Sequence, residues 1–241
     1  MKYREFNAYS ELRDNALALL KEHVVKKSFE PHAVMLSGAK TPQPIYDAIA
    51  SNPPDVHRSF HLILADDRYV PVESKDSNYG NMLGMIKTLG LSESQVLRIH
   101  AELDLDAAAE KYDNNLASFL NNGGSIPLGF LGLGTDGHTA SLFSKDLLKE
   151  TGRYAIAVSR PDGMEGISVT REFLLKCDSL IFLVTGPEKQ QAVERMMNNP
   201  QDVVAAQAVS GVKHVELWYS AQRAEGGNPE TSTGCKHLRP E

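Results

Sequence analysis

A glycine-rich segment around one histidine is the part of the sequence best suited to proton-transfer chemistry. Residues 132–143 read Gly-Leu-Gly-Thr-Asp-Gly-His-Thr-Ala-Ser-Leu-Phe and follow an apolar run at 128–131. The imidazole of His138 can act as a general base near neutral pH, and Asp136 can orient the ring or its loop. Gly134 lets the backbone pass close to a ligand. A lone histidine is more often structural than catalytic, but a strand-to-helix loop rich in glycine favours a functional role.

A second segment offers backbone donors and a cation to an anionic ligand. Ser37-Gly38-Ala39-Lys40-Thr41-Pro42 lies between an apolar run and a helical pattern. We expect Thr41 to cap the helix and Pro42 to lie in its first turn, so that unpaired N–H groups face a ligand. An ordinary strand-turn-helix connection is the alternative. The candidate phosphate-binding residues here are Ser37, Gly38, Lys40 and Thr41.

Two further predicted strands are followed by charged residues. Asp66-Asp67-Arg68 comes directly after the run 60–64, and the planar guanidinium of Arg68 suits a phosphate unless it forms a surface ion pair with a neighbouring aspartate. Lys189 falls in the expected first turn of a helix that follows Thr185-Gly186-Pro187. A lysine is unfavourable for the helix dipole at that position, so it is either solvated or compensated by a bound anion.

Short apolar runs alternate with helical patterns along the chain, which is typical of an α/β fold with a mostly parallel sheet flanked by helices. Ligands bind beyond the carboxyl ends of the strands in such sheets, so we expect the polar segments above to meet there. One domain is expected at 1–220, and a disordered tail at 221–241, which is rich in Gly, Pro, Glu, Ser and Thr. The expected strands are 33–36, 60–64, 96–99, 128–131, 154–158, 180–184 and 215–219, and the expected helices are 9–29, 42–50, 78–89, 106–121, 171–177 and 187–198.

The overall composition narrows the class of protein. The chain has 241 residues and a formal net charge of −6, which does not suit nucleic-acid binding, so an anionic substrate would need a local basic pocket. Its two cysteines, Cys177 and Cys235, do not suggest a disulfide framework or a thiolate metal site. Residues 1–10 lack the apolar stretch of a secretory signal, so we expect a cytoplasmic protein without a membrane partner.

Together these segments resemble the 6-phosphogluconolactonases of the glucosamine-6-phosphate isomerase/6-phosphogluconolactonase superfamily. The resemblance covers residues 5–220 and is most specific at 134–143. It implies a modified Rossmann-like sheet, no metal or cofactor, a small phosphosugar lactone as substrate, and a monomer or weak homodimer. It also implies that Arg68 and Lys189 bind the substrate phosphate, with Asp67 at the position where the family commonly has glutamate.

The chain departs from the family pattern at several positions. Ala39 and Lys40 differ from the usual phosphate turn, and Ser144 stands where proline is common. The family often carries an arginine at the position of Gly166. Arg160 or Arg171 is the expected substitute.

The resemblance implies hydrolysis of 6-phospho-D-glucono-1,5-lactone to 6-phosphogluconate in the oxidative pentose phosphate pathway, with His138 as base and then as acid. One alternative is a glucosamine-6-phosphate deaminase or isomerase, in which Asp66 or Asp67 would be the carbon base. Another is a regulator that binds sugar phosphates without catalysis. The run 139–143 and the arginine after the acidic pair favour the lactonase.

Overall fold

Seven parallel strands form the main sheet of the protein, for which a computed structural model describes residues 1–38 and 41–224. The strand order is β1-β10-β9-β6-β2-β3-β5, with all pairs parallel. The expected α/β fold with a mostly parallel sheet is therefore confirmed. The strands are β1 (Lys2–Glu5), β2 (His32–Leu36), β3 (Phe60–Leu64), β5 (Val96–Leu97), β6 (Ser125–Leu131), β9 (Ser179–Thr185) and β10 (His214–Ser220).

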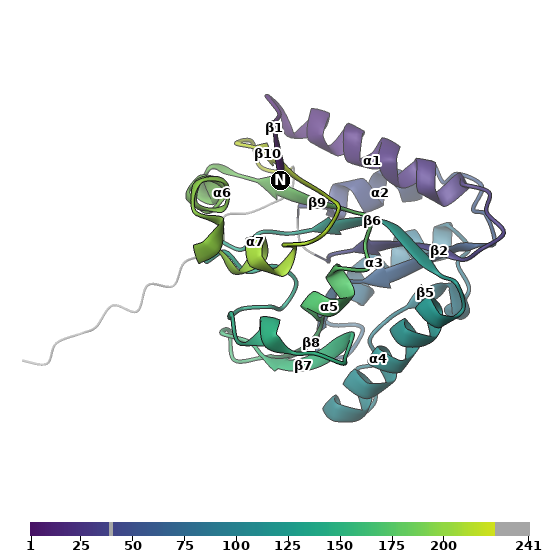
Figure 1. Ribbon diagram of the computed structural model, residues 1–241. Helices are drawn as coiled ribbons and strands as arrows, with labels where there is room; N and C mark the ends of the chain where they lie inside the picture. Colours follow the sequence, from purple (N-terminus) through teal and green to yellow (C-terminus); the bar gives the residue numbers. More distant parts are fainter. Residues whose placement is uncertain (39–40, 225–241) are drawn as a thin grey trace, which may run out of the picture.

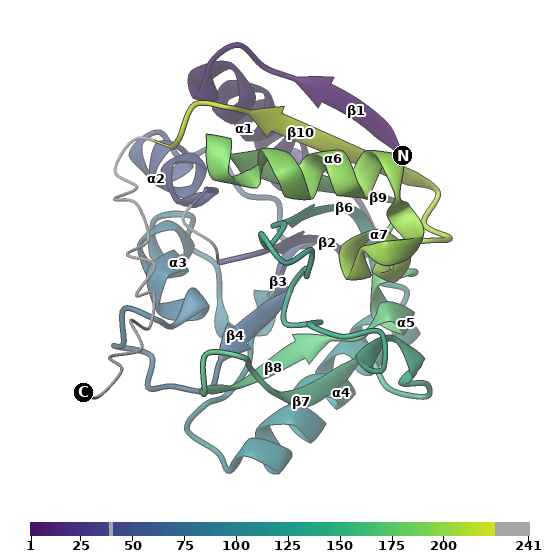
Figure 2. The same ribbon diagram turned by 90° about the vertical axis from the view of Figure 1, so that its left-hand side faces the viewer.

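A second, antiparallel sheet was not expected from the sequence. It has the order β4-β8-β7, with β4 at Asp66–Arg68, β7 at Ala155–Ser159 and β8 at Glu165–Val169. The run 154–158, which alternation with helices suggested for the parallel sheet, instead forms a hairpin strand paired with β8. Figure 2 shows this sheet continuing below β3. The chain passes from one sheet to the other within two residues, between the end of β3 and the start of β4.

The helices agree with the expected ones in position, with shorter ends in several cases. They are α1 (Tyr9–Val25), α2 (Gln43–Ser51), α3 (Asn78–Thr88), α4 (Leu105–Asn121), α5 (Arg171–Leu174), α6 (Gln190–Asn198) and α7 (Val204–Ala208). The helix expected at 187–198 begins instead with a 3₁₀ turn at Pro187–Lys189. The short helix α7 and the charged edge strand β1 were not expected.

Alternating side chains of each central strand pack into two separate cores. In β9, Leu180, Phe182 and Val184 face α4, α6, α7 and the second sheet. Ile181 and Leu183 face α1, α2 and α3. Strands covered on both faces are continuously apolar, which explains why the sequence pattern located them. Figure 1 shows α1 and α2 on one side of the main sheet and α4, α5 and the second sheet on the other.

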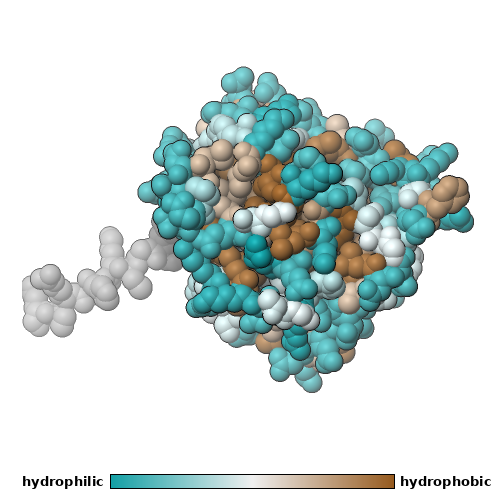
Figure 3. All heavy atoms as spheres, viewed as in Figure 1, coloured by the Kyte–Doolittle hydropathy of each residue, from teal (hydrophilic) through white to brown (hydrophobic). Residues whose placement is uncertain are grey.

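The surface has the mixed character of an ordinary globular protein. Figure 3 shows a mainly hydrophilic face with hydrophobic residues gathered towards its middle. Large hydrophobic side chains that are exposed include Tyr3 and Phe29. Within the described ranges, no helix combines the length and the apolar character needed to cross a bilayer. The tail expected at 221–241 lies outside the described residues from 225 onwards.

Candidate functional site

Four neighbouring strands of the main sheet bring the polar segments to one edge. The order β9-β6-β2-β3 places side by side the loops that follow Thr185, Leu131, Leu36 and Leu64. Because the strands are parallel, all four loops leave from their carboxyl ends. Open α/β sheets bind ligands beyond this edge, and the sequence predicted that the polar segments meet there.

The imidazole of His138 is held by the carboxylate of Asp136. Nδ1 lies 2.6 Å from Oδ1 of Asp136, and the same oxygen accepts a hydrogen bond from the His138 backbone N–H at 3.2 Å. The hydrogen bond from His138 lowers the pKa of Asp136 to about 2, against the raising effect of burial. With 27% of its side chain exposed, the ring is accessible to solvent, and Nε2 forms no hydrogen bond to a described residue.

The backbone of the histidine loop is shaped around this pair. A Cβ atom at Gly134 would overlap the His138 ring and the Asp136 carboxylate, so a side chain there is incompatible with their contact. Gly137 has φ +94°, a left-handed conformation that favours glycine. The Gly134 N–H donates to the His138 carbonyl at 2.9 Å, and the Thr139 hydroxyl donates to the Gly132 carbonyl at 2.8 Å.

Asp67 organises the amino terminus of α3. Its carboxylate accepts backbone N–H bonds from Arg68 at 2.8 Å, Asn78 at 2.6 Å and Tyr79 at 3.0 Å. The Ser77 hydroxyl donates to the second oxygen at 3.3 Å. Burial raises the pKa of Asp67 to about 6, although these backbone hydrogen bonds act in the opposite direction. The carboxylate thus joins β4 to α3.

Arg68 is positioned by an amide side chain. Its Nη1 donates to Oδ1 of Asn78 at 2.8 Å and to the Asp76 carbonyl at 3.3 Å. The Asn78 side chain lies against Gly38 in the loop after β2. A Cβ atom at Gly38 would overlap it, so this contact requires glycine. Arg68 forms no ion pair with any carboxylate of residues 1–38 and 41–224. The surface ion pair considered as an alternative is therefore not observed.

The loop after β2 contacts the end of β9. The hydroxyls of Thr41 and Thr185 lie 3.0 Å apart, and the Tyr9 hydroxyl donates to the Thr41 carbonyl at 2.8 Å. Thr41 does not cap the helix as expected, because α2 begins one residue later and Pro42 occupies the cap position. The Tyr46 hydroxyl donates a hydrogen bond to the Ser37 carbonyl at 2.7 Å.

The remaining candidate phosphate ligands are Ser37, Lys189 and Lys40. The Ser37 hydroxyl is buried and has no hydrogen-bond partner among residues 1–38 and 41–224. Lys189 lies half-buried at the end of the 3₁₀ turn after β9, without an ion pair in the described part of the chain. Lys40 lies outside the described residues, as does Ala39.

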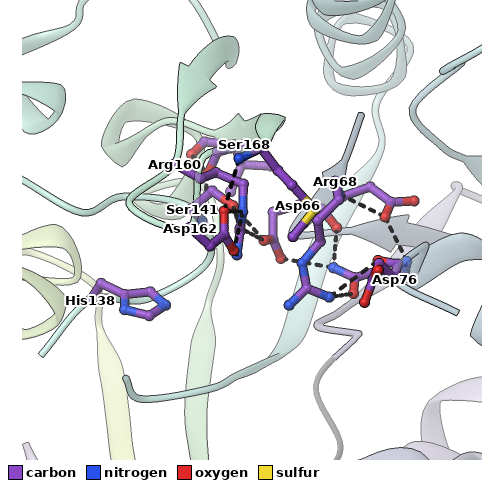
Figure 4. A network of polar contacts seen from close by, with 12 residues as sticks. Asp66, Arg68, Asp76, His138, Ser141, Arg160, Asp162 and Ser168 are labelled. Carbon is purple, nitrogen blue, oxygen red and sulfur yellow. Dashed lines mark hydrogen bonds and ion pairs between the residues drawn. The ribbon is translucent and has the colours of Figure 1, made fainter. Parts of the chain in front are cut away.

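A buried polar network connects the second sheet to the histidine loop. The Ser141 hydroxyl donates to Oδ2 of Asp66 at 2.7 Å and accepts from Nη1 of Arg160 at 2.8 Å. Figure 4 shows these side chains between Arg68 and His138. Of the two expected substitutes for the family arginine, Arg160 lies here against Gly166. Arg171 instead donates to backbone carbonyls at Gln207 and Ser210.

The family model for glucosamine-6-phosphate isomerases/6-phosphogluconolactonase matches residues 7–218. The chain belongs to this family. Among curated members it is similar to a 6-phosphogluconolactonase of Synechocystis sp., with 34% identity over 168 residues, which cover 66% of this chain and 69% of the relative.

Solved structures with the same fold include 6-phosphogluconolactonases and a glucosamine-6-phosphate deaminase. A 6-phosphogluconolactonase of Thermotoga maritima superposes with a TM-score of 0.76 at 22% identity, covering 91% of this chain and 99% of that chain. A monomeric glucosamine-6-phosphate deaminase superposes with a TM-score of 0.75 at 16% identity, covering 91% and 97%. At these identities the superpositions establish the fold.

A cavity in the described structure lies away from this site. This cavity, of about 470 Å³, lies near the first residues of β9 and β10, lined among others by Ser179 and His214. That is the opposite end of the strands from His138. Within the described ranges, no three His, Cys, Asp or Glu side chains are grouped to hold a metal ion. The expectation that the protein needs no metal or cofactor stays a prediction.

Proposed function

We propose that the chain hydrolyses 6-phosphogluconolactone, with His138 as general base and then general acid. The observation that carries this proposal is the contact of 2.6 Å between His138 Nδ1 and the Asp136 carboxylate. When Nδ1 carries the proton donated to Asp136, the lone pair of the neutral ring is on Nε2. The name of the curated relative from Synechocystis supports the choice of substrate.

The proposed reaction needs only the transfer of one proton each way. Water attacks the lactone carbonyl carbon while its proton passes to Nε2 of His138. The tetrahedral intermediate then collapses, the bond from the carbonyl carbon to the ring oxygen breaks, and the imidazolium returns the proton to that oxygen. Asp136 stabilises the transient imidazolium because it remains ionised at every pH well above its pKa of about 2. General acid–base catalysis of this kind contributes about 10²- to 10⁴-fold.

Arg68 and Lys189 are the proposed phosphate ligands, with Ser37, Gly38, Thr41 and, from the sequence alone, Lys40. The guanidinium of Arg68 is anchored by Asn78 but not neutralised by Asp66 or Asp67, whose oxygens are engaged by other donors. A positioned cation without a protein counter-ion favours an anionic ligand. Binding of the remote phosphate would orient the lactone over His138.

The test of this proposal is to assay the purified protein with 6-phosphogluconolactone and with glucosamine 6-phosphate side by side. We expect turnover of the lactone, a loss of about 10²- to 10⁴-fold in kcat for His138→Asn, and mainly a higher KM for Arg68→Met. His214→Asn is the control, because His214 lies at the opposite end of the sheet. Deamination without lactone hydrolysis would favour the rival enzyme. Phosphosugar binding without turnover of either substrate would favour the regulator, and full activity of His138→Asn would remove the proposed base.

A further inference from the structure

The side chain of Arg160 points inwards although it belongs to a surface hairpin. The turn between β7 and β8 is closed by hydrogen bonds from the Arg160 N–H to the Met164 carbonyl at 2.9 Å and from the Gly163 N–H to the Arg160 carbonyl at 3.1 Å. Gly163 has φ +82°, which suits such a tight turn. Only 7% of the Arg160 side chain is exposed.

The space for this side chain exists because residue 166 is glycine. Gly166 pairs with Arg68 of β4 and with Val158 of β7. A Cβ on Gly166 would lie 3.1 Å from Cδ of Arg160 and 3.1 Å from the Asp67 carbonyl oxygen. The aliphatic part of Arg160 therefore lies directly over the backbone of β8, at the centre of the second sheet.

The guanidinium of Arg160 is held by polar partners on both sides. Nη1 donates to the Ser141 hydroxyl at 2.8 Å and lies 4.0 Å from Oδ2 of Asp66. Nη2 donates to Asp162 at 2.8 Å, and Nε donates to the same carboxylate at 3.2 Å. These contacts fix the plane of the guanidinium.

One face of the guanidinium is turned to an aromatic ring that also contacts His138. Cζ of Arg160 lies 5.1 Å from the centroid of the Phe143 ring, within the range of a cation–π interaction. The Phe143 ring in turn lies 4.4 Å from the His138 ring, centroid to centroid, at an interplanar angle of 44°. Phe143 therefore lies in contact with both Arg160 and His138. Figure 4 shows the His138 ring to one side of the network that holds Arg160.

We propose that Arg160 is a positioning residue that acts on His138 through Phe143. The inference rests on the proposed function, in which His138 is the base. The buried guanidinium, immobilised by Asp66, Ser141 and Asp162, fixes the Phe143 ring, and this ring limits the orientations open to the imidazole. Asp136 holds the ring at Nδ1, and Phe143 holds its plane. Small errors in the orientation of a general base reduce the rate strongly, so loss of Arg160 should lower kcat more than it changes KM.

The first test is a double-mutant cycle on kcat with Arg160→Met and Phe143→Leu. We expect each single variant to lose about 10-fold in kcat, with KM within about twofold of wild type, and the double variant to be no worse than the poorer single variant. Arg4→Met is the matched control, because Arg4 makes a similar contact with Phe6 at 4.4 Å at the far edge of the sheet and should leave kcat unchanged. Additive losses in the double variant would overturn the proposal.

The second test does not depend on turnover. The ring ¹H–¹⁵N correlations of His138, assigned by their disappearance in His138→Asn, should shift in Arg160→Met and stay unchanged in Arg4→Met. Arg160→Lys keeps a positive charge near Asp66 and should recover thermal stability while leaving the His138 signals displaced. If the ring signals of Arg160→Met match those of wild type, Arg160 has only a structural role. If wild type fails to hydrolyse the lactone while these signals shift, the proposed function fails and the positioning role stands.

Discussion

Asp136 and His138 are two residues apart in sequence, and the short loop between them gives Asp136 a dual role. Its Oδ1 atom contacts the imidazole at 2.6 Å and the His138 backbone N–H at 3.2 Å. The carboxylate therefore orients both the ring and the peptide that carries it. Its low pKa, about 2, means that its own titration does not contribute to the pH dependence of the rate near neutrality.

Asp136→Asn is expected to lower kcat by about 10- to 100-fold, because hydrogen bonds to charged groups contribute about 1.5–3 kcal/mol. KM should change little, since the carboxylate acts on the base. Steady-state kinetics on the lactone provide the measurement. Asp146→Asn is the control, since Asp146 is exposed and forms an ion pair with Lys149 at the surface. An Asp136→Asn enzyme with wild-type kcat would show that the ring needs no carboxylate.

Asp67 should make stability depend on pH in the direction opposite to that of an ordinary ion-paired carboxylate. Its pKa rises from 3.8 to about 6 in the folded state because of burial, so the folded state binds the proton more tightly than the unfolded state. This contribution is greatest below pH 4 and is lost as the pH rises through 6, by on the order of 3 kcal/mol. Urea unfolding of wild type and Asp67→Asn from pH 4 to 7 measures it. Parallel curves for the two proteins would contradict the assignment.

At the scale of elements, the conformation of the histidine loop depends on a glycine that no larger residue can replace without a clash. Gly134 leaves room for the imidazole and the carboxylate at the same time. The loop is further tied to α7, because the Ala205 N–H donates to the Gly137 carbonyl at 2.8 Å. Its shape is thus set by its own glycines and by a helix almost seventy residues later in the sequence.

Gly134→Ala should reduce kcat by at least about 100-fold, because the added methyl group must displace either the His138 ring or the Asp136 carboxylate. Kinetics and thermal unfolding together give the measurement. Gly84→Ala is the matched control, since its Cβ would meet no atom within 4 Å in α3, and it should stabilise the helix by about 1 kcal/mol. Retained activity in Gly134→Ala would show that the loop can adjust.

The helices and strands that could be predicted from the sequence are those with a clear hydrophobic pattern. β9 and β2 are apolar except at their terminal residues, because both of their faces are covered. β1 is exposed at all four residues, and β4 has three charged residues, so neither carries a pattern that indicates a strand. β7 was located but placed in the wrong sheet, because the pairing of a strand depends on partners that its own pattern does not specify.

In the candidate site, too, the sequence predicts where a residue of one segment lies but not which distant segment it contacts. That His138, Asp136 and Arg68 lie at the carboxyl edge of the main sheet could be predicted, because each stands shortly after an apolar run. The contact of Arg160 with Ser141 and the fit of Asn78 against Gly38 could not be predicted, because each joins segments that are distant in sequence and meet only in the tertiary structure. The role of Asp67 at the start of α3 likewise depends on tertiary structure.

At the scale of the molecule, the two cores are linked through the sheet edge that carries the site. Tyr112 of α4 is fully buried, and its hydroxyl donates to the Leu64 carbonyl. That carbonyl belongs to the last residue of β3, just before the chain crosses into the second sheet. The packing of α4 therefore supports the crossing point on which Asp66 and Arg68 depend.

Tyr112→Phe should lower the free energy of unfolding by about 1–3 kcal/mol, because it removes a buried hydrogen bond to the Leu64 carbonyl. KM for the lactone should stay close to the wild-type value. Chemical denaturation measures the effect, with Tyr154→Phe as the control, since the contact of Tyr154 with Phe173 involves its ring. Equal stability of Tyr112→Phe and wild type would mean that this hydrogen bond makes no net contribution.

The position of β1 has a consequence for biosynthesis. In the described sheet, residues 2–5 pair only with β10, at residues 216–219, so β1 has no strand partner until β10 has been synthesised. Contacts between residues so distant in sequence form slowly. The nascent chain must therefore keep one short, charged strand unpaired while the central strands assemble, and the charges of Lys2, Arg4 and Glu5 help that waiting segment to resist aggregation.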